Sequence, residues 1–392
     1  MKIKLGVFFG GKSVEHEIAV ITANQAYSSI DKEKYEVIPV YISKQGLMYT
    51  GEDLFELSEY KDMNKLIQRL TQVTFINDGQ KINILRYPMK KFGDNVLNTI
   101  DVAFPIMHGT NGEDGTIQGF LELLGIPYIG CDILSSSIGM DKIVMKKVLA
   151  QSGLPVVNYV DFYSMEYVKD EENILKKVEE KLTYPVIVKP GNLGSSVGIK
   201  KADNKEKLIE AIEFAIQFSD RIIVEKAVTK LKEINCSVIG DVTNCNASVC
   251  EEPIFSDEIL SYTDKYVGGN KTKGVPQQGQ KAMAASKKRL PAEISKEKTE
   301  EIQSLAKQTF KVLGANGVSR IDFLIDEAED KVYVNEINTI PGALSYYLWE
   351  ATGKKFTQEI DELVDLALKR QRERENRTYS YDQNILSLTG KK

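Results

Sequence analysis

The sequence predicts an α/β protein of two or three domains that begins with a doubly wound sheet. A run typical of a buried strand, Ile3–Phe9, leads through a glycine-rich turn at 10–13 into a segment of helical periodicity, Val14–Ile30. Doubly wound sheets begin with this order of strand, turn and helix, and they bind ligands at the carboxyl ends of their strands. A chain of 392 residues is also too long for one small core.

The composition is that of a globular protein without general affinity for polyanions. Hydrophobic residues make up 42% of the chain and charged residues 27%, which is ordinary for a soluble protein. A net charge of −5 gives no attraction to nucleic acid or to an anionic membrane. No apolar run approaches the roughly 20 residues that span a bilayer. The apolar part of the N-terminus is too short for a signal peptide, so we expect a cytoplasmic protein.

Cysteine and histidine usage argues against a disulfide framework and against a zinc site. The four cysteines show no paired C-x-x-C spacing, so reduced thiols are expected. They are Cys131, Cys236, Cys245 and Cys250. With only His16 and His108 in the chain, a zinc site built from histidines is not expected.

Two further strands are predicted in the first part of the chain. Tyr35–Ile42 is one, and Asp101–Met107 is a buried strand that runs directly into the loop HGTNGEDG at 108–115. Three glycines in this loop let backbone N–H groups approach a ligand, and a helix at Thr116–Leu124 follows. Residues 45–98 are polar and irregular apart from a helical stretch at Met63–Leu70. We predict that they form an insertion carrying little chemistry.

Two residues beside these turns are candidates for a ligand site. The turn at 10–13 matches neither G-x-G-x-x-G nor G-x-x-x-x-G-K-[ST], so dinucleotide and Walker-type sites are rejected. Glu15 either favours the positive end of the first helix dipole or faces a cationic group of a ligand above the sheet edge. A lone histidine near glycines is usually structural, but His108 lies at the carboxyl end of a strand, where ligands bind.

The middle of the chain adds a lysine in an unusual place. A helix is predicted to open at Ser135 and to end near Gly153, with Lys142 in its first turns. A lysine early in a helix opposes the helix dipole, so this position is mildly unfavourable unless the ammonium group binds an anion.

A glycine- and serine-rich segment follows the strand Tyr184–Lys189. Residues 191–198, GNLGSSVG, include Ser195 and Ser196 and suit a lid whose N–H and hydroxyl groups close over phosphates. The alternative is a plain hairpin turn, for which eight residues with three glycines are long. A strand at Arg221–Glu225 comes next.

The last third of the chain is predicted to contain strands, a polar loop and helices. The strands are Glu233–Ile239 and Ala247–Glu252, and an amphipathic helix spans Glu297–Leu313. The loop at 256–269 has a length typical of active-site lids. A segment at Leu344–Trp349 precedes a helix from Thr357 to about Arg374, and residues 370–392 are predicted to be a loosely held tail.

Two strands, Arg320–Ile325 and Val332–Ile337, are predicted to pair as a hairpin that ends at a Pro-Gly turn. Side chains alternate along a strand, so one face can gather Asp322, Glu336 and Asn338, with Arg320 beside them. Two carboxylates and an amide oxygen are donors that hold Mg²⁺ together with substrate phosphates. A wet edge hairpin without a metal remains the alternative reading of this stretch alone.

The order of these features along the chain resembles that of the D-alanine–D-alanine ligase family within the ATP-grasp superfamily. The motifs are GGKSVEHE at 10–17, HGTNGEDG at 108–115, VKPGNLGSSVGI at 188–199, YTDKY at 262–266 and NEINTIPG at 335–342. The resemblance covers residues 3 to about 342. It implies a doubly wound N-terminal domain at 1–133 and a two-lobed α+β ATP-grasp fold, with a central lobe at 134–228 and a C-terminal lobe at 229–392.

The resemblance also implies the ligands. ATP would lie between the lid sheet and the C-terminal sheet, with Lys142 and Lys189 on its phosphates. Two Mg²⁺ ions, which Mn²⁺ could replace, would be held by the hairpin residues. The adenine would meet Glu225 and Val228, and the ribose would meet Glu233. The protein would form a homodimer.

The reaction implied is peptide-bond formation between two D-alanines for peptidoglycan synthesis, through an acyl phosphate. Glu15 would hold the ammonium group of the first amino acid and would be linked through Ser195 to Tyr266. His108 would lie where the two substrates meet, and Lys265 would reach the transferred phosphoryl group. Arg320 and the Gly342 N–H would stabilise the tetrahedral intermediate. The lid at residues 191–198, which includes Ser196, would shield the acyl phosphate from water.

The chain departs from the family pattern at one place that concerns the second substrate. A tyrosine at the position of Tyr266 accompanies ligases that form an amide. Family members usually place a Ser-Leu pair after the Pro-Gly turn to bind the second carboxylate, and here Tyr347 precedes Leu348. Ser345 could substitute. D-Serine, D-lactate or another amino acid therefore stays an alternative acceptor, and a non-catalytic ATP-binding scaffold is the alternative from another class.

Overall fold

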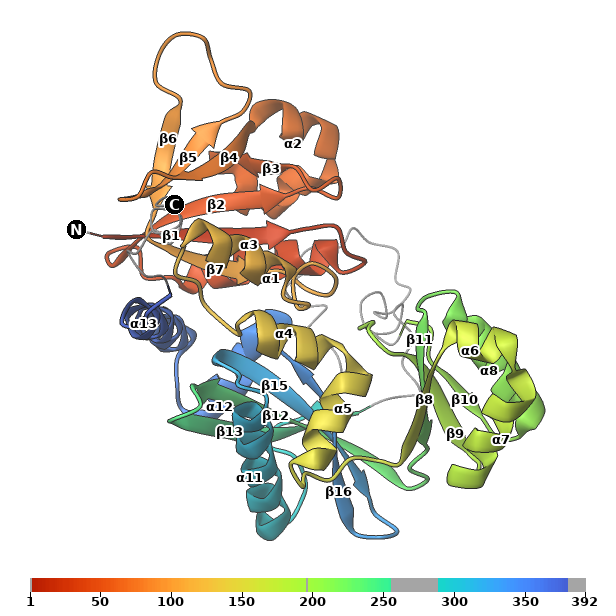
Figure 1. Cartoon of the computed structure of the whole chain (residues 1–392). Helices are drawn as coiled ribbons and strands as arrows, with labels where there is room; N and C mark the ends of the chain where they lie inside the picture. The colour runs from red at the N-terminus through yellow and green to blue at the C-terminus, as the bar shows by residue number, and fades with distance from the viewer. Residues whose placement is uncertain (1, 195–196, 255–287, 380–392) are drawn as a thin grey trace, which may run out of the picture.

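The computed structural model describes residues 2–194, 197–254 and 288–379. They form three sheets, each made from its own stretch of the chain (Figure 1). The predictions for Ser195, Ser196, Lys265 and Tyr266 lie outside the described residues, as does the loop at 256–269.

The first sheet confirms the predicted doubly wound start. In its parallel part, β1 (Ile3–Gly10) lies between β2 (Tyr35–Ile42) and β7 (Val102–Ile106). Helix α1 (His16–Ser29) packs on one face of this part and α3 (Thr116–Leu124) on the other. The carboxyl ends of β1 and β7 therefore meet at one edge, where the turn at 10–13 and the loop at 108–115 begin.

The prediction that residues 45–98 are an irregular insertion is wrong. Four strands there extend the first sheet to seven, in the order β6-β5-β4-β3-β2-β1-β7. They are β3 (Met48–Thr50), β4 (Thr71–Asn77), β5 (Ile82–Arg86) and β6 (Val96–Ile100), and the expected helix is α2 (Met63–Arg69), preceded by 3₁₀ turns η1 (Glu52–Phe55) and η2 (Leu57–Lys61). Only short alternating runs, such as Val73 and Phe75, are buried in this stretch. Because the rest of the stretch is polar, these runs were not recognised as strands in the sequence.

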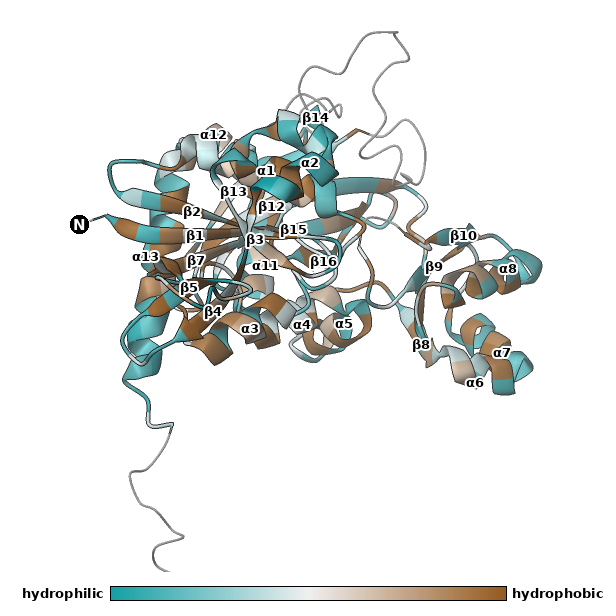
Figure 2. Ribbon diagram, turned by 90° about the horizontal axis from the view of Figure 1, so that it is seen from above, coloured by the Kyte–Doolittle hydropathy of each residue, from teal (hydrophilic) through white to brown (hydrophobic). Residues whose placement is uncertain are grey.

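The second sheet is antiparallel and is covered on one face by helices. Its strands are β8 (Tyr159–Tyr163), β9 (Val186–Pro190), β10 (Lys200–Ala202) and β11 (Arg221–Lys226), in the order β10-β9-β11-β8. The helices are α6 (Ser164–Lys169), α7 (Glu171–Lys181) and α8 (Lys205–Ile216). Apolar residues of α7 and α8 join those of β9 and β11 in one core (Figure 2).

The third sheet has one apolar face and one polar face. Its strands are β12 (Leu231–Gly240), β13 (Cys245–Pro253), β14 (Lys288–Arg289), β15 (Gly317–Asp326) and β16 (Lys331–Asn338), in the order β14-β13-β12-β15-β16. Ile321, Phe323 and Ile325 pack with helices α5 (Lys142–Gln151) and α11 (Lys296–Val312). Because side chains alternate, Arg320 and Asp322 lie on the opposite face, which we call the site face.

The helix predicted from Ser135 to Gly153 is two helices. The first is α4 (Ile133–Met140), and the second is α5, whose first residue is Lys142. Asp141 separates them, and its carboxylate accepts hydrogen bonds from the N–H groups of Ile143 and Val144 at 3.0 and 2.9 Å. An aspartate that caps a new helix therefore fixes the place of Lys142.

The chain ends by returning to the first sheet. After the turn η3 (Gly342–Ser345) and α12 (Tyr346–Thr352), helix α13 (Phe356–Glu375) packs against β1 and α1 (Figure 1). The prediction that residues 370–392 form a loosely held tail is wrong for residues 370–375, which belong to α13. Arg370 donates to the carbonyls of Gly130 and Tyr128 at 2.6 and 2.5 Å. Residues 380–392 are outside the described part.

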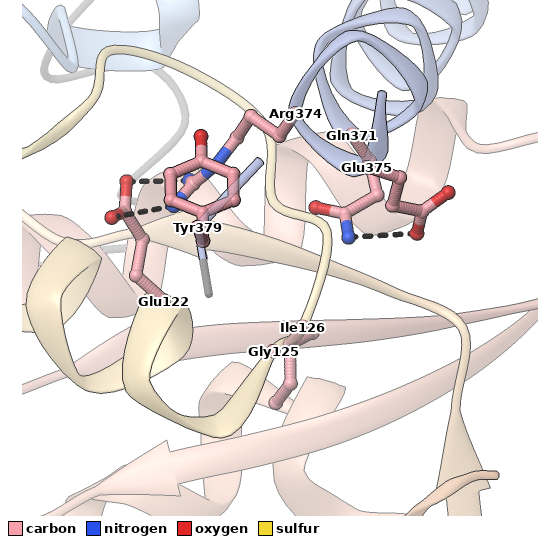
Figure 3. A pocket seen from close by; sticks show the side chains of 7 residues that line it. All are labelled: Glu122, Gly125, Ile126, Gln371, Arg374, Glu375 and Tyr379. Carbon is pink, nitrogen blue, oxygen red and sulfur yellow. Dashed lines mark hydrogen bonds and ion pairs between the residues drawn. The ribbon is translucent and has the colours of Figure 1, made fainter. Parts of the chain in front are cut away.

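A cavity of about 200 Å³ lies beside the end of this helix. Arg374 of α13 and Glu122 of α3 form an ion pair of 2.7 Å there (Figure 3). None of the predicted site residues lines this cavity. Among the described residues, no helix combines the length and the apolar character that crossing a membrane requires.

Helix α13 buries a carboxylic acid that we expect to control stability as pH changes. The Glu359 side chain is fully buried, and neither of its oxygens has a hydrogen-bond partner within the described chain. Burial raises the pKa of Glu359 well above its ordinary value of 4.5, and Lys354 only partly opposes this. The folded state therefore holds a proton that the unfolded chain releases, and stability falls as pH rises above that ordinary value.

We predict that Glu359→Gln removes this loss of stability at rising pH. The variant should match the parent protein near pH 4.5 and exceed its free energy of unfolding near neutral pH by about 1 kcal/mol or more. Urea unfolding at a series of pH values measures the difference. Glu373→Gln, at an exposed position of the same helix, is the control and should follow the parent curve. A Glu359→Gln curve parallel to the parent curve would contradict the prediction.

Candidate active site

The hairpin β15–β16 brings its predicted polar residues together on the site face. Asp322 lies directly opposite Glu336, and Arg320 opposite Asn338. The Arg320 guanidinium binds both Asp322 oxygens, at 2.7 and 2.8 Å, and Asn338 Nδ2 donates to Asp322 Oδ2 at 3.0 Å. Directly opposed residues of antiparallel strands point to the same side, so all four polar groups face one space.

Lys142 reaches this space from helix α5. Its ammonium group lies 3.3 Å from Glu336 Oε2 and donates to the carbonyl of Leu193 at 2.8 Å. A small cavity of about 40 Å³ opens here. Its lining includes Glu113, Lys142, Gly194, Glu336, Asn338 and Thr339. A lysine from α5, the start of the glycine-serine segment and the hairpin oxygens thus converge at one point.

A buried ion triad holds the second predicted lysine. Lys189 Nζ lies 2.7 Å from Glu225 Oε2, and Lys146 Nζ lies 3.2 Å from Glu225 Oε1. Lys189 Nζ is also 3.5 Å from Asn335 Oδ1 of β16. The exposed fractions are 9% for Lys189, 2% for Glu225 and zero for Lys146. Glu225 therefore connects β11 with β9 and with helix α5.

Charge inside the triad decides the ionisation of its members. Burial alone would raise the pKa of Glu225, but Lys146 and Lys189 outweigh burial and lower it to about 2. Burial lowers the pKa of Lys146, and Glu225 only partly compensates. For Lys189 the Glu225 carboxylate outweighs burial, so the pKa rises. Glu233 lies near enough to contribute to that rise.

Glu15 and His108 lie at the carboxyl ends of β1 and β7, at the edge where the first sheet meets the hairpin turn. A Cβ atom added to Gly109 would lie 2.6 Å from Glu15 Oε2, and one added to Gly194 would lie 3.5 Å away. His108 Nδ1 is 2.9 Å from the carbonyl of Ile340, and Nε2 is 3.1 Å from the Thr22 hydroxyl. Burial lowers the pKa of His108, which favours a neutral imidazole.

Sequence reasoning missed the role of Glu113. The N–H of Gly109 donates to Glu113 Oε2 at 2.9 Å, and the N–H of Ile340 donates to Oε1 at 3.2 Å. Burial, with the charge of Glu15, raises the pKa of Glu113 to about 8. Glu113 and His108 together bind both backbone groups of Ile340, so the loop at 108–115 fixes the turn that carries Gly342. Glu113 sits in that loop's glycine-rich sequence, the signal that could have found it.

The backbone after Gly342 is strained. Ala343, Leu344 and Ser345 have φ angles of 51°, 53° and 57°, in the left-handed region that residues with a Cβ seldom occupy. Ser345 is fully buried. Tyr347 lies near Arg320, Glu251 and Asp322, which all influence its pKa. Of the two residues considered for the second carboxylate, Tyr347 therefore lies near the polar residues of the site face, whereas Ser345 is fully buried.

Three further residues, Val228, Glu233 and Glu225, were predicted to contact the nucleoside. Val228 is half-buried after β11, and Glu233 lies opposite Leu324 of β15, on the site face by alternation. Both carboxylate oxygens of Glu225 are ion-paired with lysines, and its predicted contact with the adenine stays a prediction.

The donor chemistry of the hairpin fits Mg²⁺. Asp322 and Glu336 are directly opposed on adjacent strands, and Asn338 lies two residues further along β16, so carboxylate and amide oxygens share one face. Asp322 is engaged by Arg320 in this arrangement. No cluster of three or more His, Cys, Asp or Glu side chains in metal-binding geometry occurs within residues 2–194, 197–254 and 288–379. A metal would therefore bind with substrate phosphates as additional ligands.

We predict that Glu225→Gln destabilises the fold in a pH-dependent manner. The folded pKa of about 2 lies below the ordinary value of 4.5, so the carboxylate contributes stability above that ordinary value and loses it as pH falls towards 2. Two buried lysines without a counter-charge should cost about 3 kcal/mol near neutral pH. Urea unfolding at about pH 7 and at about pH 3 should show the gap between parent and variant narrowing at acid pH. A constant gap would refute the assignment.

Comparisons with known proteins agree over nearly the whole chain. Residues 4–131 match the family described as D-ala D-ala ligase N-terminus, and residues 148–365 match D-ala D-ala ligase C-terminus. The D-alanine–D-alanine ligase of Thermosipho melanesiensis is 41% identical over 387 residues, which cover 98% of this chain and 99% of that protein.

Solved structures show the same similarity in three dimensions. The D-alanine–D-alanine ligase of Coxiella burnetii superposes with a TM-score of 0.78 at 28% identity, covering 95% of this chain and 96% of that one. The VanG D-Ala:D-Ser ligase of Enterococcus faecalis gives a TM-score of 0.76 at 31% identity, covering 94% and 100%. The chain belongs to the D-alanine–D-alanine ligase family of ATP-dependent ligases and has its ATP-grasp fold.

Proposed function

We propose that this protein joins two D-alanine molecules into a dipeptide for peptidoglycan precursors, with cleavage of ATP to ADP and phosphate. The observation that carries the proposal is the convergence of Lys142 with Glu336 and Asn338, beside Lys189 at Asn335. Amines from α5 and β9 thus meet hard oxygen donors from the hairpin, as binding of a triphosphate with metal ions requires. The names of the relatives give the substrate.

The first step transfers the γ-phosphoryl group of ATP to the carboxylate of the first D-alanine. Such transfers depend on positioning and charge neutralisation. Lys142 and Lys189 bind the phosphates, and Glu225 keeps Lys189 charged and in place. Asp322, Glu336 and Asn338 hold two Mg²⁺ ions, which neutralise phosphate charge when bound. Val228 contacts the adenine and Glu233 the ribose.

The second step is attack of an amine on the acyl phosphate. The nitrogen of the second amino acid, as a free amine, bonds to the acyl carbon. Phosphate leaves with the electron pair of the cleaved C–O bond and takes up the proton that the nitrogen loses. Glu15 holds the ammonium group of the first D-alanine, and the neutral His108 lies beside the junction of the substrates. Arg320 and the N–H of Gly342 stabilise the oxyanion. Two segments, 191–198 and 256–269, exclude water from the reaction; they carry Ser195, Ser196, Lys265 and Tyr266.

A different acceptor remains a second candidate function. Tyr347 stands where the family usually has a serine, and the VanG relative is named a D-Ala:D-Ser ligase. The ATP chemistry would be the same, because only the pocket beyond Arg320 would change.

We further propose a cytoplasmic homodimer of three domains, 1–133, 134–228 and 229–392. ATP as a substrate supports the location. The resemblance to the family supports the dimer, and so do the exposed apolar side chains of Leu123 on α3 and Leu134 on α4, which are 91% and 65% exposed. Each proposed domain contains one of the three sheets.

We predict phosphate release from ATP and Mg²⁺ when D-alanine is added, with D-alanyl-D-alanine as the product. A coupled phosphate assay across D- and L-amino acids and D-hydroxy acids, with product identification by mass spectrometry, measures this. Robust release with another acceptor and none with D-alanine alone would replace D-alanine by that acceptor.

We predict that Arg320→Ala lowers kcat by about 100- to 1000-fold, because one oxyanion donor is lost. ATP binding, measured by calorimetry, should change little. Arg320→Lys is the matched variant and should recover part of the rate, since it keeps the charge but not the two-pronged contact with Asp322. Unchanged turnover in Arg320→Ala would remove this residue from the mechanism.

A further inference from the structure

The site face continues past the hairpin to a residue that has no role so far. Strand registers align Glu336 with Asp322, Asp322 with Asn235, and Asn235 with Glu251 of β13. Directly opposed residues share a face, so Glu251 points to the same side of the sheet as Asp322. Its neighbour Glu252 points to the other side by alternation and forms an ion pair of 3.0 Å with Arg289.

Glu251 is a buried carboxylate with unused binding capacity. Its exposed fraction is 5%, and its Oε2 atom has no hydrogen-bond partner in the described part of the chain. A buried oxygen of this kind is costly unless something binds it. Arg320 directs two of its N–H groups to the oxygens of Asp322 on the same row.

An aromatic ring and a second cation lie beside this carboxylate. Lys288 of β14 places its ammonium group 3.4 Å from the centre of the Tyr347 ring. Glu251 lies close enough to Lys288 and to Tyr347 to influence the pKa of each. Arg320 is near both as well. A negative and a positive group therefore flank the phenol, next to the proposed oxyanion donor.

We propose that Glu251, Lys288 and Tyr347 form the pocket for the second substrate, and that this pocket selects a zwitterionic α-amino acid over a hydroxy acid. The proposal rests on the proposed function. The Glu251 carboxylate binds the incoming ammonium group, Lys288 binds the incoming carboxylate, and the Tyr347 ring limits the side chain. Lys288 and Tyr347 take the place of the usual serine.

The selectivity follows from the Glu251 oxygen that has no hydrogen-bond partner within residues 2–194, 197–254 and 288–379. An α-amino acid brings an ammonium donor to that oxygen, whereas a hydroxy acid brings no cation to it. A site built to bind one polar group rejects an analogue lacking it far more strongly than an apolar pocket does. The same pocket would accept D-serine only where its hydroxymethyl group fits beside Tyr347.

The test separates the two substrate sites. Hydroxylamine trapping of the acyl phosphate reports the first D-alanine and ATP alone, and dipeptide formation reports the acceptor. Glu251→Gln should raise the acceptor KM at least about tenfold and lower the preference for D-alanine over D-lactate by a similar factor. Lys288→Met should raise the acceptor KM similarly, and Lys288→Arg should restore it. Hydroxamate formation should not change in any of them.

Adjacent residues supply the controls. Glu252→Gln removes a charge next to Glu251, on the opposite face of the sheet, and Arg289→Met removes one next to Lys288. Both variants should leave the acceptor KM unchanged. If Glu251→Gln fails to fold by circular dichroism, the Lys288 series decides alone. Unchanged acceptor KM in the Lys288 or Glu251 variants, or equal changes in the controls, would overturn the pocket. Absence of hydroxamate in the parent protein would instead overturn the proposed function.

Discussion

One buried carboxylate, Glu225, determines how the nucleotide side of this site is assembled. It binds Lys189 of β9 and Lys146 of α5, and its negative charge offsets part of the cost of burying these two amines. Because α5 packs in the core of the third sheet while β9 and β11 belong to the second, the triad connects the two sheets between which ATP is proposed to lie. The position of Lys189 beside Asn335 follows from this arrangement.

The acceptor side depends on strand register rather than on buried charge. Four directly opposed residues place Glu251, Asn235, Asp322 and Glu336 in one row across the third sheet. A shift of one residue in any of these strands would turn its polar groups into the apolar core of α5 and α11. The odd-numbered residues Ile321 and Phe323, buried in that core, therefore hold the polar row in place.

The sequence predicted what local periodicity and turn chemistry encode. Strand β2 and helix α3 were predicted with their observed bounds, and alternation correctly put Arg320, Asp322, Glu336 and Asn338 on one face. Contacts between distant segments could not be predicted in this way. Nothing local indicates that Glu225 pairs with Lys146, that Glu113 binds Ile340, or that Glu251 joins the row of Asp322. The strands within residues 45–98 were missed because their buried residues form only short runs within a largely polar stretch.

Helix α13 has a consequence for how the polypeptide matures. Leu5, Val7 and Phe9 of the first strand share a core with Phe356, Ile360 and Leu363, more than three hundred residues later. During translation one apolar face of the first sheet therefore stays uncovered until helix α13 has been synthesised. The middle and third sheets can complete their own cores during that interval, so the segment made first is the last to become fully protected from solvent.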